Sequence, residues 1–402
     1  MSSSEHRIAR RKLLAGSAAI GATLVTRSTA SAHATGATRN RRASLEMDER
    51  RYVELDADFL GTQTAHYPRI KRMRNGRFIL FYQSSQYAWT VYCATSRDLR
   101  HWTKPEALFE THKILDGADD RCYASPDGRV LDNGDVLAVC SFRANHGFSS
   151  NMKLDGLMMR RSTDHGRTWQ PEQVIYVGAN WEPFVHQTDT GEVQVYFTHP
   201  APKVAVQNTK GSTGVAIIRS HDRGRTWKPD VREFPFAADR VAQQYTRTTD
   251  GGVMMFTDQM PSALQIGRHG RIALAMESHL ANGDYMISLA HTSDNWPDKL
   301  AMDETGPSDR QNNVFLGAAP YLARFPSGES VLTYNRASRQ QVRLGDRDAR
   351  EFSDPTSFLP GTGFWGSTEL AAPRRLVTTM ANVRSDGNKI MIGVLDLVGH
   401  GW

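Results

Sequence analysis

The sequence predicts an all-β fold, a six-bladed β-propeller with four-stranded antiparallel blades. Three observations support this prediction: an internal repeat of about 60 residues, a glycine turn between two apolar runs in each repeat, and a proline at a fixed distance before the glycine. The turn glycines are separated by 58, 57, 79, 58 and 59 residues, and they are Gly76, Gly134, Gly191, Gly270, Gly328 and Gly387.

Each repeat has the pattern of a β-hairpin followed by a third strand. Runs rich in β-forming residues follow each glycine, as in Phe78-Ile79-Leu80-Phe81-Tyr82, and polar turn residues between apolar runs indicate a hairpin. Proline fits the start of a strand, because its missing N–H costs no ladder bond there. The prolines eight or nine residues before the glycines are Pro68, Pro126, Pro183, Pro261 and Pro320.

Two features of the repeat concern its ends and its length. The chain stops soon after the expected second strand of unit six, so we predict that the segment from Tyr52 to Phe59 completes that blade from the N-terminus. The third unit is longer by about 20 residues, which predicts an extra loop or hairpin. Two β-sandwiches are the alternative fold, but sandwich strands need not repeat at this period.

The first 32 residues have the layout of an export signal. Arg10-Arg11-Lys12 precedes an apolar run from Leu13 to Val25, and Ala30-Ser31-Ala32 supplies small residues for cleavage. Thirteen apolar residues are too few for a membrane span, which needs about 20. The paired arginines are similar to a twin-arginine signal, so we expect an extracellular protein. The predicted domains are therefore a signal peptide over 1–32, a flexible linker over 33–47 and the propeller over 48–402.

Charge and cysteine content exclude several classes of function. The chain of 402 residues has a net charge of +6, of which the signal carries +4, so the folded part is close to neutral and no nucleic-acid partner is expected. The three cysteines, Cys93, Cys122 and Cys140, are an odd number with no metal-ligand spacing. We predict no metal and no cofactor, a monomer, and no membrane contact once the signal is removed.

Two segments identify a family resemblance. Ser162-Thr163-Asp164-His165-Gly166-Arg167-Thr168-Trp169 resembles the Asp box, Ser-x-Asp-x-Gly-x-Thr-Trp, and Ser220 to Trp227 repeats it 58 residues later. Ser96 to Trp102 and Ser293 to Trp296 resemble decayed copies. The box is typical of the sialidase superfamily, where it has a structural role at the turn from the third to the fourth strand, on the face opposite the funnel mouth. Its Asp accepts backbone N–H groups and its Trp packs between blades.

Shorter motifs refine the resemblance over most of residues 48–402. Tyr67-Pro68-Arg69-Ile70 resembles the first-blade arginine motif of sialidases. Other motifs resemble the exo-α-1,5-L-arabinanases of the same superfamily, and they are Trp181-Glu182-Pro183-Phe184, Asp258-Gln259-Met260-Pro261, Ala275-Met276-Glu277-Ser278 and Gly317-Ala318-Ala319-Pro320-Tyr321. In those enzymes two glutamates at such positions act by a retaining mechanism. Gln259 departs from the pattern, which has glycine there.

The repeat itself brings two glutamates to one rim. Glu182 precedes Pro183 and therefore opens the inner strand of unit three, whereas Glu277 lies seven residues after Gly270 and ends the second strand of unit four. Both positions are expected at the mouth, on adjacent blades. Equivalent positions in other units carry no carboxylate, and these residues are Gln83, Ser141, Thr198 and Asn335 for Glu277 and Tyr67, Ser125, Met260 and Ala319 for Glu182.

Such a pair is what glycoside hydrolysis requires, an acid for the leaving oxygen and a carboxylate that attacks or activates water. We predict retention, with Glu277 as nucleophile and Glu182 as acid/base, although these roles are interchangeable on the sequence alone. Retaining enzymes hold the two carboxyl groups about 5–5.5 Å apart, and inverting enzymes about 6.5–9.5 Å. The structural alternative is that each glutamate forms a salt bridge with a nearby arginine.

Further substrate-binding residues follow from the same register. Arginines at the mouth would bind a carboxylate or orient sugar hydroxyls, and aromatic residues would stack on sugar faces; the alternatives are solvated rim charges and packing between blades. The predicted substrate-binding residues are Tyr67, Arg69, Asp120, Arg121, Arg143, Trp181, Asp258, Tyr321 and Arg336.

Three functions remain open on the sequence. The first is an exo-acting glycoside hydrolase on an oligo- or polysaccharide, resembling exo-α-L-arabinanase. The second is an exo-α-sialidase, which needs an arginine cluster and a Tyr–Glu nucleophile. The third is a propeller that binds glycans without catalysis.

Overall fold

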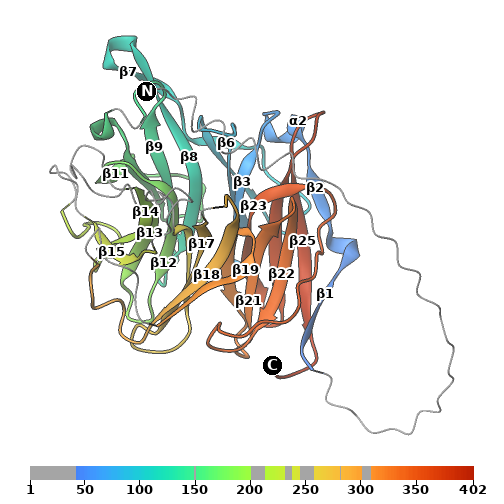
Figure 1. Cartoon of the computed structure of the whole chain (residues 1–402). Helices are drawn as coiled ribbons and strands as arrows, with labels where there is room; N and C mark the ends of the chain where they lie inside the picture. Colours follow the sequence, from blue (N-terminus) through green and yellow to red (C-terminus); the bar gives the residue numbers. More distant parts are fainter. Residues whose placement is uncertain are drawn as a thin grey trace, which may run out of the picture.

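The computed structural model describes residues 42–148, 151–200, 213–230, 238–244, 258–280, 282–300 and 309–402. Six antiparallel sheets succeed one another along the chain, which confirms the predicted six-bladed propeller (Figure 1). The first blade contains β3 (His66–Arg72), β4 (Phe78–Gln83), β5 (Val91–Ser96) and β6 (Glu106–Phe109). The second contains β7 (His112–Ile114), β8 (Asp119–Val130), β9 (Val136–Ala144), β10 (Gly156–Ser162) and β11 (Gln173–Val177).

In the third, fourth and fifth blades the strands also pair in the order in which they follow along the chain, with the first strand nearest the axis. The third contains β12 (Trp181–Gln187), β13 (Val193–Pro200), β14 (Thr213–Ser220) and β15 (Asp239–Ala242). The fourth contains β16 (Gln259–Gln265), β17 (Ile272–His279), β18 (Tyr285–Thr292) and β19 (Arg310–Leu316), and the fifth contains β20 (Ala318–Arg324), β21 (Ser330–Arg336) and β22 (Arg339–Gly345). The third unit includes residues 201–212, 231–237 and 245–257, so the extra loop predicted there falls largely outside the described residues.

The sixth blade joins the two ends of the chain. It contains β23 (Gly363–Ala372), β24 (Arg375–Asn382) and β25 (Lys389–Val398), and both β1 (Ser44–Met47) and β2 (Val53–Leu55) pair with β25. In Figure 1 these blue strands lie beside the red β25. The closure predicted from the N-terminus is thus confirmed, and the sheet also reaches back into the segment predicted as linker. Short helices accompany the strands: η2 (Glu49–Arg51), α2 (Ala57–Leu60), η3 (Leu115–Gly117) and η4 (Met152–Leu154).

One turn assignment was wrong. Gly387 lies between β24 and β25, so it connects the second and third strands of its blade rather than the first and second. The first two strands of this blade meet instead in the tight turn after Ala372, where the register is Ala372 to Arg375. The chain therefore ends after the third strand of the blade, and the N-terminal strands supply the outermost one.

The same strained backbone recurs in the inner strand of every blade. In each blade, one non-glycine residue of the inner strand has φ between 46° and 55° and lies in a β-bulge. These residues are Tyr67, Ser125, Glu182, Met260, Ala319 and Trp365. Five of them precede the repeated prolines, which occupy the bulge because no ladder N–H is needed there. A left-handed conformation costs about 1–3 kcal/mol per residue and is typical of functional sites, where the surrounding structure enforces it.

The Asp boxes lie where the sequence predicts, after the third strands of the second and third blades. In the first box, Asp164 accepts the backbone N–H groups of Arg167 and Thr168 at 3.1 and 2.9 Å. Trp169 packs edge-on against Phe81 of the first blade, with ring centroids 6.2 Å apart. The box therefore fixes a turn and fills the space between two blades.

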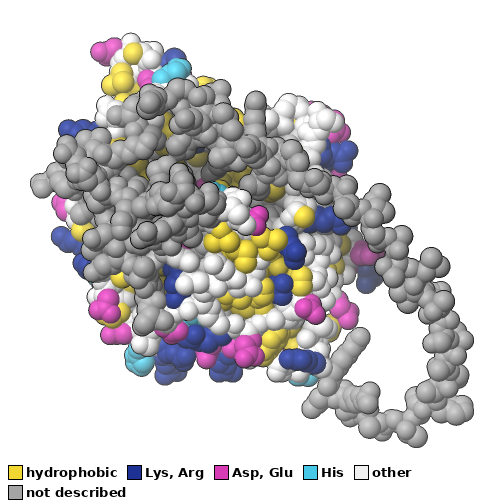
Figure 2. Space-filling view, in the orientation of Figure 1, with side chains coloured by type: hydrophobic (Ala, Val, Ile, Leu, Met, Phe, Trp, Pro, Cys, Tyr) yellow, Lys and Arg dark blue, Asp and Glu magenta, His cyan; other side chains and the backbone are white. Residues whose placement is uncertain are grey.

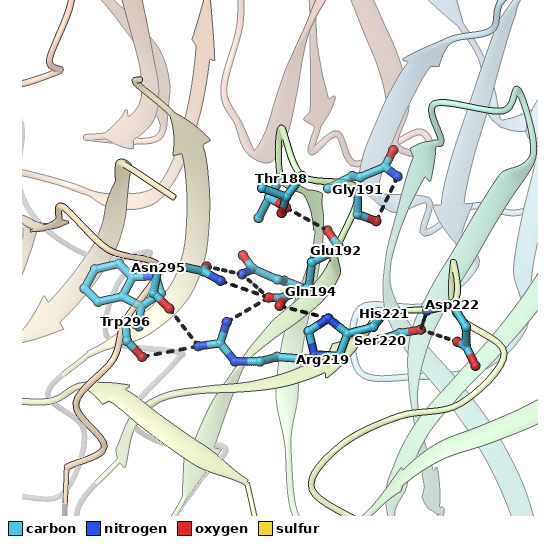
Figure 3. A network of polar contacts seen from close by, with 12 residues as sticks. Thr188, Gly191, Glu192, Gln194, Arg219, Ser220, His221, Asp222, Asn295 and Trp296 are labelled. Carbon is cyan, nitrogen blue, oxygen red and sulfur yellow. Dashed lines mark hydrogen bonds and ion pairs between the residues drawn. The ribbon is translucent and has the colours of Figure 1, made fainter. Parts of the chain in front are cut away.

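A polar network extends from the second box to its decayed neighbour (Figure 3). Glu192, in the turn after β12, accepts hydrogen bonds from Gln194 at 2.7 Å, Arg219 at 2.8 Å and Asn295 at 3.2 Å. Arg219 also donates to the backbone carbonyl of Asn295 at 3.0 Å. These bonds join the third and fourth blades on the face opposite the mouth.

Other expectations concern cysteines and membranes. Cys93, Cys122 and Cys140 are all buried and free. No helix among the described residues is long and apolar enough to cross a membrane. Figure 2 shows charged side chains of both signs along the lower edge of the molecule, and hydrophobic side chains near the centre of the same view. Residues 1–41, which include the predicted signal, lie outside the described residues.

Candidate active site

The left-handed residues of several blades meet at the axis. Tyr67, Met260 and Ala319 form one buried apolar cluster, against which Trp365 packs. The Tyr67 and Trp365 rings stack with centroids 4.8 Å apart. These side chains come from the first, fourth, fifth and sixth blades, so the mouth end of the channel is a single shared site.

Glu182 joins this cluster from the third blade. Its side chain is buried, and Oε1 lies 3.4 Å from the Tyr67 hydroxyl while Oε2 accepts a hydrogen bond from Thr198 Oγ1 at 3.1 Å. Thr198 Oγ1 in turn accepts the backbone N–H of Met260 at 2.9 Å. With that acceptor position filled, the single hydroxyl proton of Thr198 is directed at Glu182. The carboxylate is therefore held between two hydroxyl groups.

Glu277 lies at the same end of the neighbouring blade. It is buried near the end of β17, opposite Gln259, the residue before Met260. Thr198 thus links the two glutamates. Its hydroxyl donates to Glu182 and accepts the N–H of Met260, and the residue before Met260, Gln259, pairs with Glu277. The sequence register correctly brings Glu182 and Glu277 to one face on adjacent blades, while their catalytic roles remain predictions.

The Glu277 position has a recurring structural task. Its Oε2 accepts the backbone N–H of Ala319, the left-handed residue of the next blade, at 2.7 Å. The equivalent residues Gln83, Thr198 and Asn335 accept the corresponding N–H groups of Ser125, Met260 and Trp365 at 2.6, 2.9 and 3.0 Å. Three of these four residues are uncharged and still accept the equivalent N–H group. The inter-blade hydrogen bond therefore does not require the negative charge of Glu277.

A buried ion pair beside Glu277 was not predicted from the sequence. Arg310, at the start of β19, places its two terminal nitrogens 2.6 and 2.7 Å from the two carboxylate oxygens of Asp258. Ser278, next to Glu277, donates to Asp258 at 2.8 Å. Asp258 is fully buried, and this pairing fixes the strand on which Glu277 lies. The 52-residue separation of the pair leaves no local sequence signal.

A second cation near the mouth was also missed. Arg240 donates to Nδ1 of His199 at 2.8 Å and to the His199 carbonyl at the same distance. Burial, and then the charge of Arg240, hold the pKa of His199 well below its usual range. His199 is therefore neutral at pH 7, with Nδ1 as the acceptor, and Arg240 carries the charge here.

Three predicted substrate-binding residues are engaged within the protein. Arg69 is buried, and its Nη1 donates to the carbonyls of Trp365 and Gly366 at 2.6 and 2.9 Å, across the seam between the first and sixth blades. Tyr321 is buried in the channel wall, and its hydroxyl lies 3.3 Å from Asp127. Asp258 is paired as described. These contacts favour positioning roles over direct contact with substrate.

The other predicted residues lie nearer the surface. Asp120, Arg121 and Arg143 belong to the ends of β8 and β9 that rise with β7 at the top of Figure 1. Asp120 forms an ion pair with Lys113 at 3.0 Å, and the Arg121 and Arg143 guanidinium groups lie over the rings of Phe142 and Phe148. Trp181 is partly buried beside Glu182, and Arg336 is exposed at the end of β21.

Asp119, at the start of β8, holds the segment after β9 in place through hydrogen bonds. It accepts the backbone N–H groups of His146 and Gly147 at 3.0 Å each, and that of Asp120 at 2.7 Å. Burial acts to raise its pKa, but these bonds outweigh it and lower the pKa to about 2. No group of three or more His, Cys, Asp or Glu side chains that could hold a metal ion occurs in the part of the chain that the structure describes.

The pattern of repeats matches a known family model. A BNR repeat-like domain covers residues 62–344. The chain belongs to this family. No curated protein sequence matches the chain significantly.

Several solved structures share the fold at low sequence identity. A protein of unknown function from Dyadobacter fermentans is 15% identical with a TM-score of 0.66, over 88% of this chain and 99% of that one. Trypanosoma rangeli sialidase is 11% identical with a TM-score of 0.55, over 83% and 55%. The GH93 α-L-arabinofuranosidase of Fusarium graminearum, in complex with arabinobiose, is 13% identical with a TM-score of 0.53, over 83% and 93%. Together with the family match over residues 62–344, this shared fold confirms the superfamily predicted from the sequence, and the neighbours include both a sialidase and an arabinofuranosidase.

Proposed function

We propose that this protein is a retaining, exo-acting glycoside hydrolase whose catalytic pair is Glu182 and Glu277. One observation carries the proposal: two buried glutamates from adjacent blades lie at the same end of the axial channel, linked through Thr198. Buried carboxylates of this kind are suited to acid–base and nucleophilic roles. The family resemblance of the surrounding motifs favours neutral furanosides such as arabinan as substrates.

In the proposed reaction, the Glu277 carboxylate attacks the anomeric carbon while Glu182 protonates the departing glycosidic oxygen. The glycosyl–enzyme ester then reacts with a water molecule, which Glu182 deprotonates, and Glu277 leaves as a free carboxylate. Because the Thr198 proton is directed at Oε2, the transferred proton of Glu182 belongs on Oε1, next to Tyr67. Tyr67 can accept from the acid and donate to the carboxylate, as the two steps require.

The experiment uses the isosteric variants Glu182→Gln and Glu277→Gln with arabinan and with sialyllactose. Hydrolysis of arabinan by the wild-type protein, and its loss in both variants, is the expected result. Retained binding of arabino-oligosaccharide in inactive variants separates catalysis from folding. If the wild-type protein binds glycans but hydrolyses none of a broad panel, the protein is a glycan-binding propeller and the proposal is wrong.

A second candidate, an exo-α-sialidase, is favoured by the contact between Tyr67 and Glu182, which has the composition of a Tyr–Glu nucleophile. In that case Tyr67 attacks the sugar and Glu182 is its base. The engagement of Arg69 by backbone carbonyls weighs against the carboxylate clamp that a sialidase needs. Tyr67→Phe distinguishes the two, because it abolishes a sialidase but leaves Glu277 able to attack.

We also propose that the protein is exported through its N-terminal segment. Support comes from the order of basic, apolar and small residues in the first 32 positions. Replacement of Arg10 and Arg11 by lysine should retain the full-length chain in the cytoplasm, as measured by fractionation. Unchanged export of that variant contradicts a twin-arginine route.

A further inference from the structure

A cavity of about 650 Å³ lies on the axis at the end of the channel opposite the mouth. Its lining comes from all six inner strands, β3, β8, β12, β16, β20 and β23. A volume of this size is typical of sites for small molecules, about 300–1,000 Å³. The polar residues that matter for its chemistry are Lys71, Arg129, His186, Gln265, Tyr321 and Glu369.

Buried polar residues separate this cavity from the mouth. Lys71 forms a buried ion pair with Asp127 at 3.0 Å, and the Tyr321 hydroxyl contacts both groups. The apolar cluster that contains Tyr67 and Met260 lies on the mouth side of these three polar residues. The cavity lining includes neither of the two glutamates, so it is a compartment distinct from the candidate active site.

Nε of Arg129 is buried and has no hydrogen-bond partner among the described residues. Nε2 of His186 and Oε1 of Gln265 have no further partner there, and these two side chains interact with each other, which acts to raise the pKa of His186 against the effect of burial. The His186 side chain is only 3% exposed. Buried polar groups are nearly always paired in folded proteins, so such a group points to water or a ligand that completes it. The unpaired N–H of Arg129, beside the polar His186–Gln265 pair, suits a polar ligand that offers an oxygen acceptor.

Among the four arginines that line the cavity, Arg129 is the one with a buried, unpaired nitrogen, because Arg72 and Arg74 are exposed and Arg324 donates to the carbonyl of Ile266. Asp127 offsets the charge of Lys71. Burial, and then the nearby Arg129, lower the pKa of His186 to about 3, so this ring is neutral at pH 7. Burial raises the pKa of Glu369 and outweighs the opposite effects of Lys71 and Arg129, which weakens it as a counter-charge. The guanidinium group has a planar pair of donors that matches a carboxylate or a phosphate.

We propose that this axial cavity binds a small molecule that carries a carboxylate or phosphate group, with Arg129 holding the oxyanion and His186 and Gln265 contacting its polar body. The cavity admits a molecule up to the size of a disaccharide. Because the site is remote from the mouth, its occupant is not the substrate that is cleaved.

Isothermal titration of the full chain with glucuronate, inorganic phosphate and glucose tests the proposal. Binding of glucuronate, phosphate or both is expected, and glucose, which lacks an oxyanion, should not bind. Binding of phosphate alone identifies a phosphate ligand, and binding of glucuronate alone identifies a sugar acid. Arg129→Gln should weaken the affinity about tenfold or more, because charge-assisted bonds to the guanidinium are lost.

The control variant is Arg268→Gln, which removes the same charge from an exposed position in the turn between β16 and β17. It should bind like the wild-type protein, as should Glu182→Gln at the mouth. Hydrolysis at the mouth should be unchanged in Arg129→Gln, so failure of this proposal is distinguishable from failure of the proposed function.

Three results overturn the proposal: no binding of either oxyanion, equal binding by Arg129→Gln and Arg268→Gln, or loss of binding in Glu182→Gln. If Arg129→Gln does not fold, a wild-type crystal soaked in glucuronate gives the answer. Density against Arg129 supports the site, and density only elsewhere contradicts it.

Discussion

Glu277 accepts the backbone N–H of Ala319 at 2.7 Å, just as Gln83 of the first blade accepts that of Ser125 at 2.6 Å. A glutamine therefore already performs, within the same protein, the structural task of Glu277. The inter-blade bond to Ala319 therefore does not itself require the charge of Glu277.

This equivalence makes Glu277→Gln an informative variant. We expect its free energy of unfolding to stay within about 1 kcal/mol of the wild-type value, because the inter-blade bond is kept. Its kcat should fall at least about a hundredfold, since the nucleophile is removed. Urea denaturation and arabinan hydrolysis measure the two effects. A stable variant with wild-type turnover would exclude Glu277 from catalysis.

Thr198 is predicted to be a positioning residue for Glu182. Thr198→Val removes the donor to Glu182 and the acceptor for Met260, which should cost about 1–3 kcal/mol of stability and reduce kcat. Thr198→Ser keeps the hydroxyl and should restore both. If Thr198→Ser is as impaired as Thr198→Val, the methyl group and its packing matter more than the hydrogen bonds.

The Arg310–Asp258 pair should dominate the stability of the fourth blade. Arg310→Leu leaves a fully buried carboxylate without its cation, which should cost about 3–5 kcal/mol in urea denaturation. Replacing Asp258 by Asn in the same chain should recover part of that loss. Arg271, whose pair with Asp348 is exposed, serves as the control, with an expected loss of less than about 1 kcal/mol. Equal losses would contradict the importance of burial.

The Asp boxes predict loss of stability in acid. Hydrogen bonds from the side chain and backbone of Thr168 hold the pKa of Asp164 well below its usual range; at Asp222 burial opposes this, but the bonds from Thr226 prevail. A depressed pKa in the folded state contributes stability above the unfolded-state pKa, about 3.9, and this contribution disappears as the pH falls further. The melting temperature should therefore drop below about pH 4, and less steeply in Asp164→Asn. Equal slopes would assign the acid sensitivity to other groups.

The fold was predictable because the blade is a repeated local pattern. The spacing of prolines and glycines located five of the six inner hairpins, and the Asp boxes fixed the face of the turns. The pattern failed at the sixth blade. Its inner strand β23 has Gly366 where the other blades have proline, and Gly387 lies in the turn between the second and third strands. A glycine alone does not tell which pair of strands it joins.

The site was predictable only where it follows the register. Glu182 and Glu277 share a rim because they occupy fixed positions in their repeats. Arg310, Arg240 and the role of Thr198 depend on contacts between segments 16 to 62 residues apart, for which the repeat gives no signal. Arg69 was expected at the substrate, whereas the structure shows it at backbone carbonyls of the last blade.

Mass spectrometry after incubation with 2-deoxy-2-fluoro-α-L-arabinofuranosyl fluoride tests the central claim most directly, because a retaining enzyme accumulates the glycosyl–enzyme ester. The account predicts one pentosyl unit per chain, on the peptide that contains Glu277, and none in Glu277→Gln. Label on Tyr67, or no label on a protein that hydrolyses arabinan, would contradict it.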